Sequence, residues 1–488
     1  MNVNIGGVIS VAFFYCLILA VGIWVGWKEK RKFKQLQRME SGANRSENIM
    51  LAGRDMGLFV GVLTMTATWV AGGYINGTCE SAFTGGFLKC STMAIGYSMS
   101  LLLGGMFFAK PMRMAHGGRG YVTMLDPFQE KYGSRIGGLL FLPALCGEIF
   151  WSAAILSALG SIFTVMLGLD NTLSIIISAA VAVTYTLIGG LYSVAYTDVI
   201  QLGCVLFGLV FCIPFVWTHP AVDHEAMSEV DWLGTIPLSS VGSYVDIYLL
   251  IILGGIPWQV YFQRVLACRS PRQAQYLSYI AALGCLTLAV PPAVLGSVAR
   301  VVDWTNGTEY GKEITTPEEI KSILPLILQY LTPKWVSFIG LGAVSAAIMS
   351  SADSTVLSTS SMFVHNIYKT VFFPKIFVRR RGLRGSFPSA SPSHLRRRLY
   401  QYLWVPNCFR NGLYSPSFER RTAFEFTSRD TLSILRRRSW RATISLSHVL
   451  NACVNHYPTI SFSYRQAHLL SWLLIFKVRR FRLFPPKQ

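Results

Sequence analysis

Runs of about twenty mostly apolar residues, the length that crosses a bilayer as a helix, recur nine times in this chain. They are centred near residues 16, 66, 97, 152, 181, 207, 252, 287 and 347. Only 14% of the 488 residues are charged and 52% are hydrophobic, which leaves too little polar surface to coat a soluble globule of this size. The sequence therefore predicts an all-α polytopic protein embedded in a lipid bilayer.

Charges in the loops give the expected orientation. The segment 28–48 carries seven Lys or Arg and the loop 110–135 carries five, whereas the segment 218–240 carries none. Because positively charged loops stay in the cytoplasm, nine crossings place the N-terminus and the loop 303–334 outside. Among the Asn-X-Ser/Thr sequences, Asn306 is the expected glycosylation site, since this topology exposes it.

Basic residues are concentrated at the C-terminal end. Residues 371–488 hold 22 Lys and Arg against three acidic residues, so they carry +19 of the net charge of +20. Arg, Ser and Leu, which have six codons each, make up 47 of these 118 residues. A frame-shifted message is therefore favoured over a genuine basic tail drawn to anionic lipid. We expect a transmembrane domain over 1–370, a disordered or artefactual segment over 371–488, and no nucleic-acid partner.

The apolar run near residue 66 ends in TATWVAGGYINGT (66–78), whose adjacent glycines Gly72 and Gly73 weaken a membrane helix. In hydrocarbon, an interrupted helix is tolerated only where it lines a cavity or is buried in protein. In transporters built from inverted repeats, such breaks lie near the midplane and freed carbonyls coordinate sodium. The glycines alone indicate a close helix crossing through small residues equally well.

The run 342–361, GAVSAAIMSSADSTVLSTSS, carries seven serines and an aspartate, and this favours the transporter interpretation. Ala347, Ser350 and Ser351 lie on one helical face, because offsets of three and four bring residues together. Two hydroxyls together with backbone carbonyls make an oxygen site of low charge, suited to sodium. Asp353, an acid in a span, needs a partner, water or a cation, so it is expected to bind an ion, pair with another helix or gate the inner mouth.

Aromatic side chains accompany the breaks. Trp69 lies in the first broken segment, and Tyr97 and Trp151 lie near the centres of their spans. Trp258 lies in GGIPWQVYFQRV, where a second helix is broken. Convergent aromatic faces bind a cation without a permanent acid, as in cages for quaternary ammonium ligands.

A further intramembrane acid, Glu148, lies one turn before the span-centred Trp151. It either faces the cavity or pairs with a residue such as Lys89, and the structural role is favoured. The sequence shows no nucleophile and base pairing, metal-ligand spacing or phosphate-binding loop, so we do not expect an enzyme.

Six blocks of the sequence resemble the sodium/solute symporter family, and within it the carriers of choline: GGYINGT, FFAKPMR, GYVTMLDPFQ, TLIGGLYSVAYTDVIQ, GGIPWQVYFQRVL and GLGAVSAAIMSSADS. The resemblance runs from about residue 5 to residue 368. It implies two inverted five-helix repeats of the leucine-transporter type, preceded by one extra helix. The spans near residues 66 and 252 would be the broken first helices of the two repeats.

The resemblance also implies a sodium site between the first broken helix and the serine-rich helix. Backbone oxygens of Ala67 and Val70 would share the ion with Ala347, Ser350 and Ser351. The implied activity is sodium-coupled, chloride-dependent uptake of choline by alternating access, which supplies acetylcholine synthesis. The implied location is multi-pass in the plasma membrane, at presynaptic terminals and in vesicle membranes, and a homo-oligomer is compatible with it.

By the same resemblance, the choline pocket is formed by Trp69, Tyr97, Trp151 and Trp258, and we hypothesise that Tyr97 and Trp258 act as lids. Two alternatives stay open. One is a symporter for another quaternary amine or small solute, although a sugar would need converging hydrogen-bonding side chains, which an aromatic cage does not supply. The other is a truncated, non-transporting membrane protein with a regulatory role.

The resemblance stops near Lys369, whereas the family continues with further helices, of which the first two complete the second repeat. The second repeat is therefore expected to be incomplete, and the chain as written is expected to transport poorly or not at all. Uptake at normal levels by the 488-residue form alone would contradict that expectation.

Overall fold

The computed structural model describes residues 5–39, 50–118, 120–168, 172–173, 176 and 191–372. Within these ranges the chain is helical, with two isolated β-bridges and no β-strand. The basic segment predicted over 371–488 lies outside the described residues, apart from its first two positions. Most of the span predicted near residue 181 also lies outside them.

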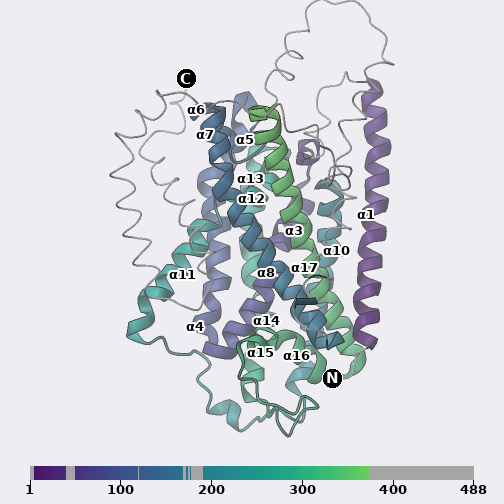
Figure 1. The fold of residues 1–488 in the computed structure, drawn as a ribbon, viewed down its shortest axis with the longest axis vertical. Coiled ribbons are helices and arrows are strands. Elements are labelled where there is room, and N and C mark those ends of the chain that lie inside the picture. Colours follow the sequence, from purple (N-terminus) through teal and green to yellow (C-terminus); the bar gives the residue numbers. More distant parts are fainter. Residues whose placement is uncertain are drawn as a thin grey trace, which may run out of the picture. The chain divides into compact units, whose positions relative to one another are not determined.

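Helices of very different lengths follow one another along the described chain (Figure 1). Short 3₁₀ turns (η1, η3 to η6) and π-helical turns (η2, η7) join or extend the α-helices. In chain order the elements are α1 Ile5–Met39, η1 Ala52–Arg54, α3 Leu58–Trp69, α4 Gly72–Gly104, η2 Gly105–Ala109, α5 Lys110–Met114, η3 His116–Gly118, α6 Asp126–Tyr132, α7 Ser134–Leu139, α8 Phe141–Leu167, α10 Leu191–Trp217, η4 Ala226–Ser228, η5 Leu238–Ser240, α11 Val241–Gly254, α12 Gln259–Ala267, α13 Pro271–Leu288, α14 Val290–Val298, η6 Ala299–Val301, α15 Pro317–Lys321, α16 Ile323–Tyr330, α17 Lys334–Met362 and η7 Phe363–Phe372.

Six helical segments of the described chain are long and apolar enough to cross a membrane, and two shorter apolar helices accompany them. Together they correspond to eight of the nine predicted spans, and the polytopic all-α class is confirmed. The long segments are Gly72–Met114, Ser134–Met166, Ser193–Trp217, Leu238–Ala267, Pro271–Val301 and Lys334–Thr370, and the short ones are Ile9–Val25 and Leu58–Trp69.

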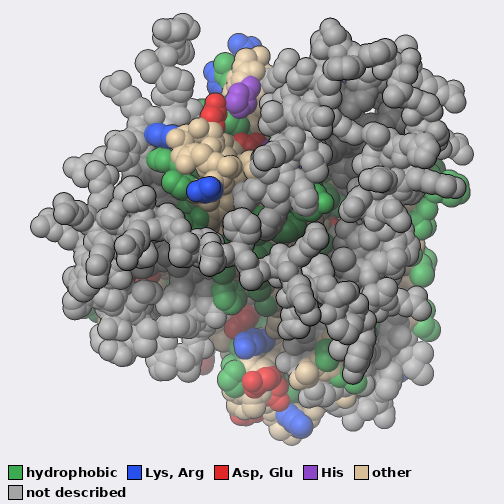
Figure 2. Space-filling model, turned by 45° about the horizontal axis from the view of Figure 1, so that its top comes forward, with side chains coloured by type: hydrophobic (Ala, Val, Ile, Leu, Met, Phe, Trp, Pro, Cys, Tyr) green, Lys and Arg blue, Asp and Glu red, His purple; other side chains and the backbone are tan. Residues whose placement is uncertain are grey.

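Large hydrophobic side chains are exposed on the outer faces of these helices. On the face shown in Figure 2, hydrophobic side chains occupy the middle, and most of the described charged side chains lie toward the top and the bottom. An apolar girdle between polar ends is the surface that a bilayer covers. Examples of exposed residues on the helices are Phe59, Phe107, Ile149, Phe207 and Leu283.

The serine-rich helix α17 packs against several partners, chiefly α10, α1 and α8. Small residues allow the close approach, as expected for helices that meet in a membrane. A Cβ atom on Gly342 would lie 2.3 Å from the Phe14 ring of α1, and one on Gly208 of α10 would lie 2.5 Å from Ala343 Cβ. Residues of α17 are therefore placed where several other helices converge.

The two loops predicted to face opposite sides of the membrane lie at opposite ends of the helices. Figure 1 shows α5, α6 and α7 of the loop 110–135 at the top, and α15, α16 and the start of α1 at the bottom. The assignment of the α5 to α7 end to the cytoplasm stays a prediction from the charge of its loop.

Both predicted helix breaks are present. α3 ends at Trp69 and α4 begins at Gly72, whereas α11 ends at Gly254 and α12 begins at Gln259. The backbone between them is extended at Ala71 (φ −85°, ψ 173°) in the first break and at Trp258 (φ −115°, ψ 130°) in the second. Extended residues interrupt the i to i−4 hydrogen bonds, so carbonyl and amide groups are freed at both breaks.

Candidate functional site

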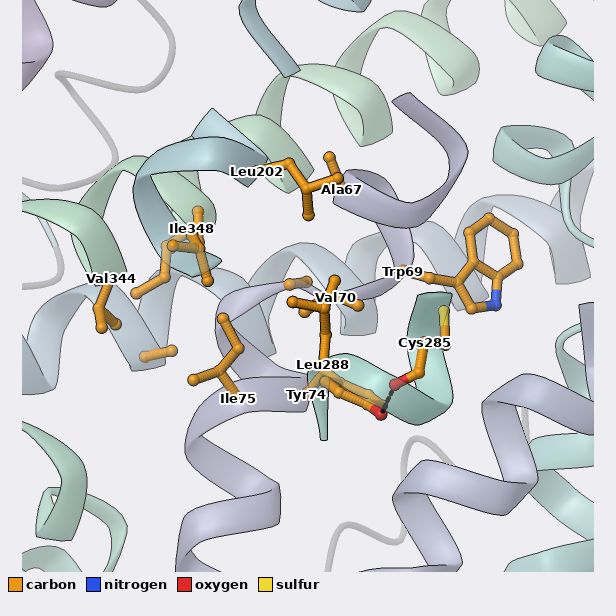
Figure 3. Packing of buried hydrophobic residues seen from close by; sticks show 14 of the residues in the cluster. Ala67, Trp69, Val70, Tyr74, Ile75, Leu202, Cys285, Leu288, Val344 and Ile348 are labelled. Carbon is orange, nitrogen blue, oxygen red and sulfur yellow. Dashed lines mark hydrogen bonds between the residues drawn. The ribbon is translucent and has the colours of Figure 1, made fainter. Parts of the chain in front are cut away.

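At the first break, the glycine pair has two different consequences. A Cβ atom on Gly72 would lie 2.1 Å from Ile348 Cγ1 of α17, whereas one on Gly73 would have no atom within 4 Å. Gly72 therefore permits a close crossing of α4 and α17 at the place where the helix is broken. The glycine pair thus accompanies both a helix break and a close helix crossing, the two interpretations that the sequence left open. In Figure 3, the Trp69 side chain points away from Val70 and Ile348. Side chains on the two sides of the break therefore pack in different parts of the protein.

The five residues predicted to hold sodium are all buried, on α17 and at the end of α3. Ser351 donates a hydrogen bond of 3.4 Å to the carbonyl oxygen of Thr68, which follows Ala67 in the chain. Ser350 instead donates to Asp198 Oδ1 on α10, at 2.5 Å. The serine-rich face of α17 thus lies against the end of α3, and its assignment to sodium stays a prediction.

A buried charged network, which the sequence did not predict, extends from this point. Arg264 of α12 and Asp198 of α10 have fully buried side chains, and Arg264 Nη2 lies 3.5 Å from Asp198 Oδ2. Asp198 also accepts a hydrogen bond from Thr64 of α3, and Arg264 donates to Ser354 of α17. Helices α3, α10, α12 and α17 therefore meet around one ion pair, which orients both broken helices against α17.

The four aromatic residues predicted to form a cage lie together. Ring centroids are 5.3 Å apart for Trp69 and Trp258, 4.8 Å for Trp151 and Trp258, and 6.3 Å for Tyr97 and Trp151. All four side chains are buried. The cluster connects the first break, through Trp69, to the second break, through Trp258.

Two more tyrosines, which the sequence did not single out, extend this cluster. Tyr74 packs edge-on against Tyr97 at 5.6 Å, and Tyr261 packs edge-on against Trp69 at 6.0 Å. Both are fixed to α13: the Tyr74 hydroxyl donates to the Cys285 carbonyl oxygen (2.7 Å, Figure 3), and the Tyr261 hydroxyl lies 2.8 Å from Ser278 Oγ. The two hydroxyls therefore hold the rim of the cluster while its centre consists of rings.

The geometry of the rings decides what the cluster can bind. A cation is attracted when it lies within about 6 Å of a ring centroid, over the ring face. The Trp258 ring already packs against both Trp69 and Trp151, so a bulky cation can lie between these rings only if they part. Trp258 has the extended backbone of the second break, which suits it to move as a lid. Trp69 Nε1 is buried and has no hydrogen-bond partner among the described residues, so a ligand hydroxyl could accept from it.

Glu148 is buried beside the cluster, and its Oε1 accepts a hydrogen bond of 3.3 Å from Ser358 Oγ of α17. The pairing with Lys89 is not formed. Lys89 is exposed and donates to Thr84 at 2.8 Å. It lies in the part of α4 whose backbone bonds to the loop that carries Trp232. The alternative role of Glu148, that it faces the cavity and takes part in gating, stays a prediction.

Asp353 is buried on α17, where α1 packs against it. It is close enough to the Tyr15 hydroxyl of α1 to interact with it electrostatically. Of the three roles predicted for Asp353, contact with another helix is the one that this position favours.

Comparison with known proteins places this geometry in context. The chain matches the Sodium:solute symporter family over residues 49–376. It is 54% identical over 374 residues to "High-affinity choline transporter 1" of Drosophila melanogaster, which covers 76% of this chain and 58% of that protein. It is also 54% identical over 380 residues to "High affinity choline transporter 1" of Homo sapiens, covering 76% of this chain and 63% of that protein. The chain thus spans about three fifths of the length of these curated relatives.

A solved structure has a similar fold: the substrate-bound, outward-open state of a Na+-coupled sialic acid symporter. It aligns with a TM-score of 0.60 at 18% identity, covering 79% of this chain and 75% of that one. This likeness confirms the leucine-transporter-like fold expected from the resemblance. The two helices expected to complete the second repeat would follow Phe372, outside the described residues.

Proposed function

Because the chain belongs to the sodium:solute symporter family, we propose that it binds choline together with sodium, in a site built for choline uptake across the plasma membrane by alternating access. The single observation that carries this proposal is the aromatic cluster that joins the two helix breaks, with Trp69 on one and Trp258 on the other. A quaternary ammonium group has no N–H to donate, so ring faces in a site shielded from water are the groups suited to hold it. A carboxylated or sugar substrate would instead need charged or hydrogen-bonding partners among the rings.

Sodium would act by joining α3 to α17. The proposed ligands are the backbone oxygens of Ala67 and Val70 with Ala347, Ser350 and Ser351. The hydrogen bond between Ser351 and the Thr68 carbonyl supports this proposal, because it brings hydroxyl and carbonyl oxygens of the two helices together. The ion would fix the end of α3 and therefore the position of Trp69, so sodium would favour choline binding, and by linkage choline would favour sodium binding.

The remaining parts of the proposal follow from the similarity to choline transporters. We propose chloride dependence, supply of choline for acetylcholine synthesis, and residence in presynaptic plasma and vesicle membranes, with a homo-oligomer as the assembly to test. The family is one of carriers, and no catalysis is proposed.

Removing the Ser351 hydroxyl tests the sodium site. Ser351→Ala is expected to raise the sodium concentration that gives half-maximal choline binding by about tenfold, since a hydrogen-bonding group that serves a charge is worth at least about 1.5 kcal/mol. Choline binding at saturating sodium should change little. Titrating sodium in a radiolabelled-choline binding assay measures both. Ser360→Ala, on an exposed position of the same helix, is the matched control. An unchanged sodium titration would remove Ser351 from the site.

The predicted topology is tested at Asn306, which is exposed in the loop between η6 and α15. Asn306→Gln is expected to make the protein migrate faster in denaturing gels and to abolish its sensitivity to an N-glycosidase, because this loop is predicted to lie outside the cell. Asn44→Gln, in a sequon predicted to be cytoplasmic, should change neither property. A change in gel migration caused by Asn44→Gln would show that the predicted orientation in the membrane is inverted.

A further inference from the structure

The loop between α5 and α6, residues 115–125, is linked at Tyr121 to α5 and, through Arg54 of η1, to the broken helix α12. Arg54 donates to the Tyr121 carbonyl oxygen (3.0 Å) and to the Leu266 carbonyl oxygen of α12 (3.3 Å). The Tyr121 amide donates to the Met112 carbonyl oxygen of α5 (3.2 Å). The part of the loop around Tyr121 is therefore tied to α5 directly and to α12 through Arg54.

The end of the loop and α6 are tied to a different element, the π-helical turn η7 that extends α17. Asn366 of η7 is fully buried, and its Nδ2 donates to Asp126 Oδ1 and Gln129 Oε1, both at 2.9 Å. Gln129 Nε2 donates back to the Asn366 carbonyl oxygen at 2.8 Å. Asp126 also accepts from the amides of Val122 (2.7 Å) and Thr123 (3.1 Å). Residues 122–129 are thereby locked onto η7.

Charge and apolar packing strengthen this lock. Burial raises the pKa of Asp126, but the hydrogen bond and charge of His365, 3.4 Å away, and the bonds from residues 122 and 123 outweigh it and lower the pKa to about 2. Asp126 is therefore an anion at neutral pH and accepts all of its bonds. Next to it a small apolar cluster is formed by Leu125, Phe141, Met362 and Ile367.

One hydrogen bond connects this locked segment to the substrate cluster. The Met124 amide donates to Gln259 Oε1 at 2.9 Å. Gln259 is the first residue of α12 and directly follows Trp258, the proposed lid. It is only 1% exposed, so water does not compete for the bond.

We propose that Gln259 is a latch, which ties the lid residue Trp258 to the loop between α5 and α6 and so keeps the site closed toward that end of the helices. The inference rests on the proposed function, because the movement of the lid is taken to accompany choline binding. Many contacts hold residues 122–129 to η7, whereas a neutral hydrogen bond holds Gln259 to them. A contact that must break in each cycle has to be weak, and a neutral hydrogen bond meets that condition better than an ion pair. Gln259 is a positioning residue, since it acts through Trp258.

A cysteine reporter tests the latch without substrate. Ser361 of α17 faces α12, where it accepts a hydrogen bond of 3.4 Å from Gln263 Nε2, and it is almost fully buried. In a background where the exposed Cys16 and Cys146 and the cysteines after residue 372 are serine, Ser361→Cys is labelled with a hydrophilic thiol reagent in inside-out vesicles. Gln259→Leu is expected to speed labelling about fivefold, the change in open population that the loss of one hydrogen bond gives.

Three variants complete the design. Gln259→Glu keeps an acceptor for the Met124 amide and should restore slow labelling. Gln275→Leu, the same replacement on α13 away from this contact, should leave labelling unchanged. If the leucine variant does not fold, Gln259→Met removes the acceptor with an unbranched side chain of similar length and should give the same increase.

Equal labelling rates in the wild type and in the variants that lack the acceptor would overturn the latch. Sodium-dependent choline binding is measured on the same vesicles to separate the two proposals. Choline binding with unchanged labelling overturns the latch alone. Faster labelling in a protein that binds no choline supports the latch as a closing contact and overturns the substrate assignment.

Discussion

Trp69→Leu is expected to weaken sodium-dependent choline binding at least about thirtyfold, enough to abolish it in a standard binding assay. A desolvated cation over a tryptophan face gains about 2 kcal/mol or more, and leucine has no quadrupole to replace it. The loss should exceed that of one ring contact, because Trp69 also packs against Trp258 and Tyr261 and orders both. Trp69→Phe, which keeps a ring, should retain weaker binding.

The control for this variant is a tryptophan of similar burial outside the cluster. Trp304 is 6% exposed, donates to the Ala299 carbonyl oxygen and packs on Tyr310, at the end of the helices where α15 lies. Trp304→Leu creates a comparable cavity, so any general cost of truncation appears in both variants. It should leave choline affinity near that of the wild type. If Trp69→Leu bound choline as tightly as Trp304→Leu, the aromatic cage would be wrong.

The second large effect is expected at the buried ion pair. Arg264→Met should destabilise the protein by about 3–5 kcal/mol, because Asp198 would be left as an uncompensated charge in the interior. Asp198→Asn alone should cost a similar amount while keeping acceptor and donor groups near Thr64 and Ser350. The double variant should cost less than the sum of the two, since it removes both charges together. Thermal unfolding of the detergent-solubilised protein, followed by size-exclusion chromatography, ranks the four proteins.

An exposed ion pair in the same protein gives the matched comparison. Arg269 Nε lies 2.7 Å from Asp55 Oδ1, but both side chains are more than half exposed. Arg269→Met should therefore cost less than about 1 kcal/mol, since exposed pairs are screened by water. Equal and additive effects at the buried and exposed pairs would contradict the view that Asp198 and Arg264 hold the broken helices together.

Local sequence features predicted the parts of the site that depend on local chemistry. The glycines near residue 72 and the Gly-Gly-Ile-Pro run before Trp258 predicted both breaks, because backbone propensity acts within a few residues. Membrane-embedded aromatic residues beside those breaks predicted the cluster. Two of its members lie in spans (Tyr97 and Trp151) and two lie at the breaks (Trp69 and Trp258), yet one chemical property identified all four.

Other features depend on which helices meet, and periodicity does not report that. Asp198 and Arg264 stand 66 positions apart, and only the packing of α10 and α12 around α17 brings them together. The sequence still carried a signal for both residues, because charged residues inside apolar runs are rare and usually functional. Tyr74 and Tyr261 gave no such signal, since tyrosines are common in membrane spans. The pairing of Glu148 with Lys89 was suggested by charge alone, and the structure places Lys89 in an exposed position.

Binding of radiolabelled choline to the purified 488-residue chain, with and without sodium, tests the central claim most directly. This binding depends on both the aromatic cluster and the sodium site, and it does not require a completed transport cycle. The predicted result is saturable choline binding that appears with sodium and disappears when potassium replaces it, with the sodium requirement raised in Ser351→Ala. Choline binding that is absent, or equal in sodium and potassium, would contradict a sodium-coupled choline site in this chain.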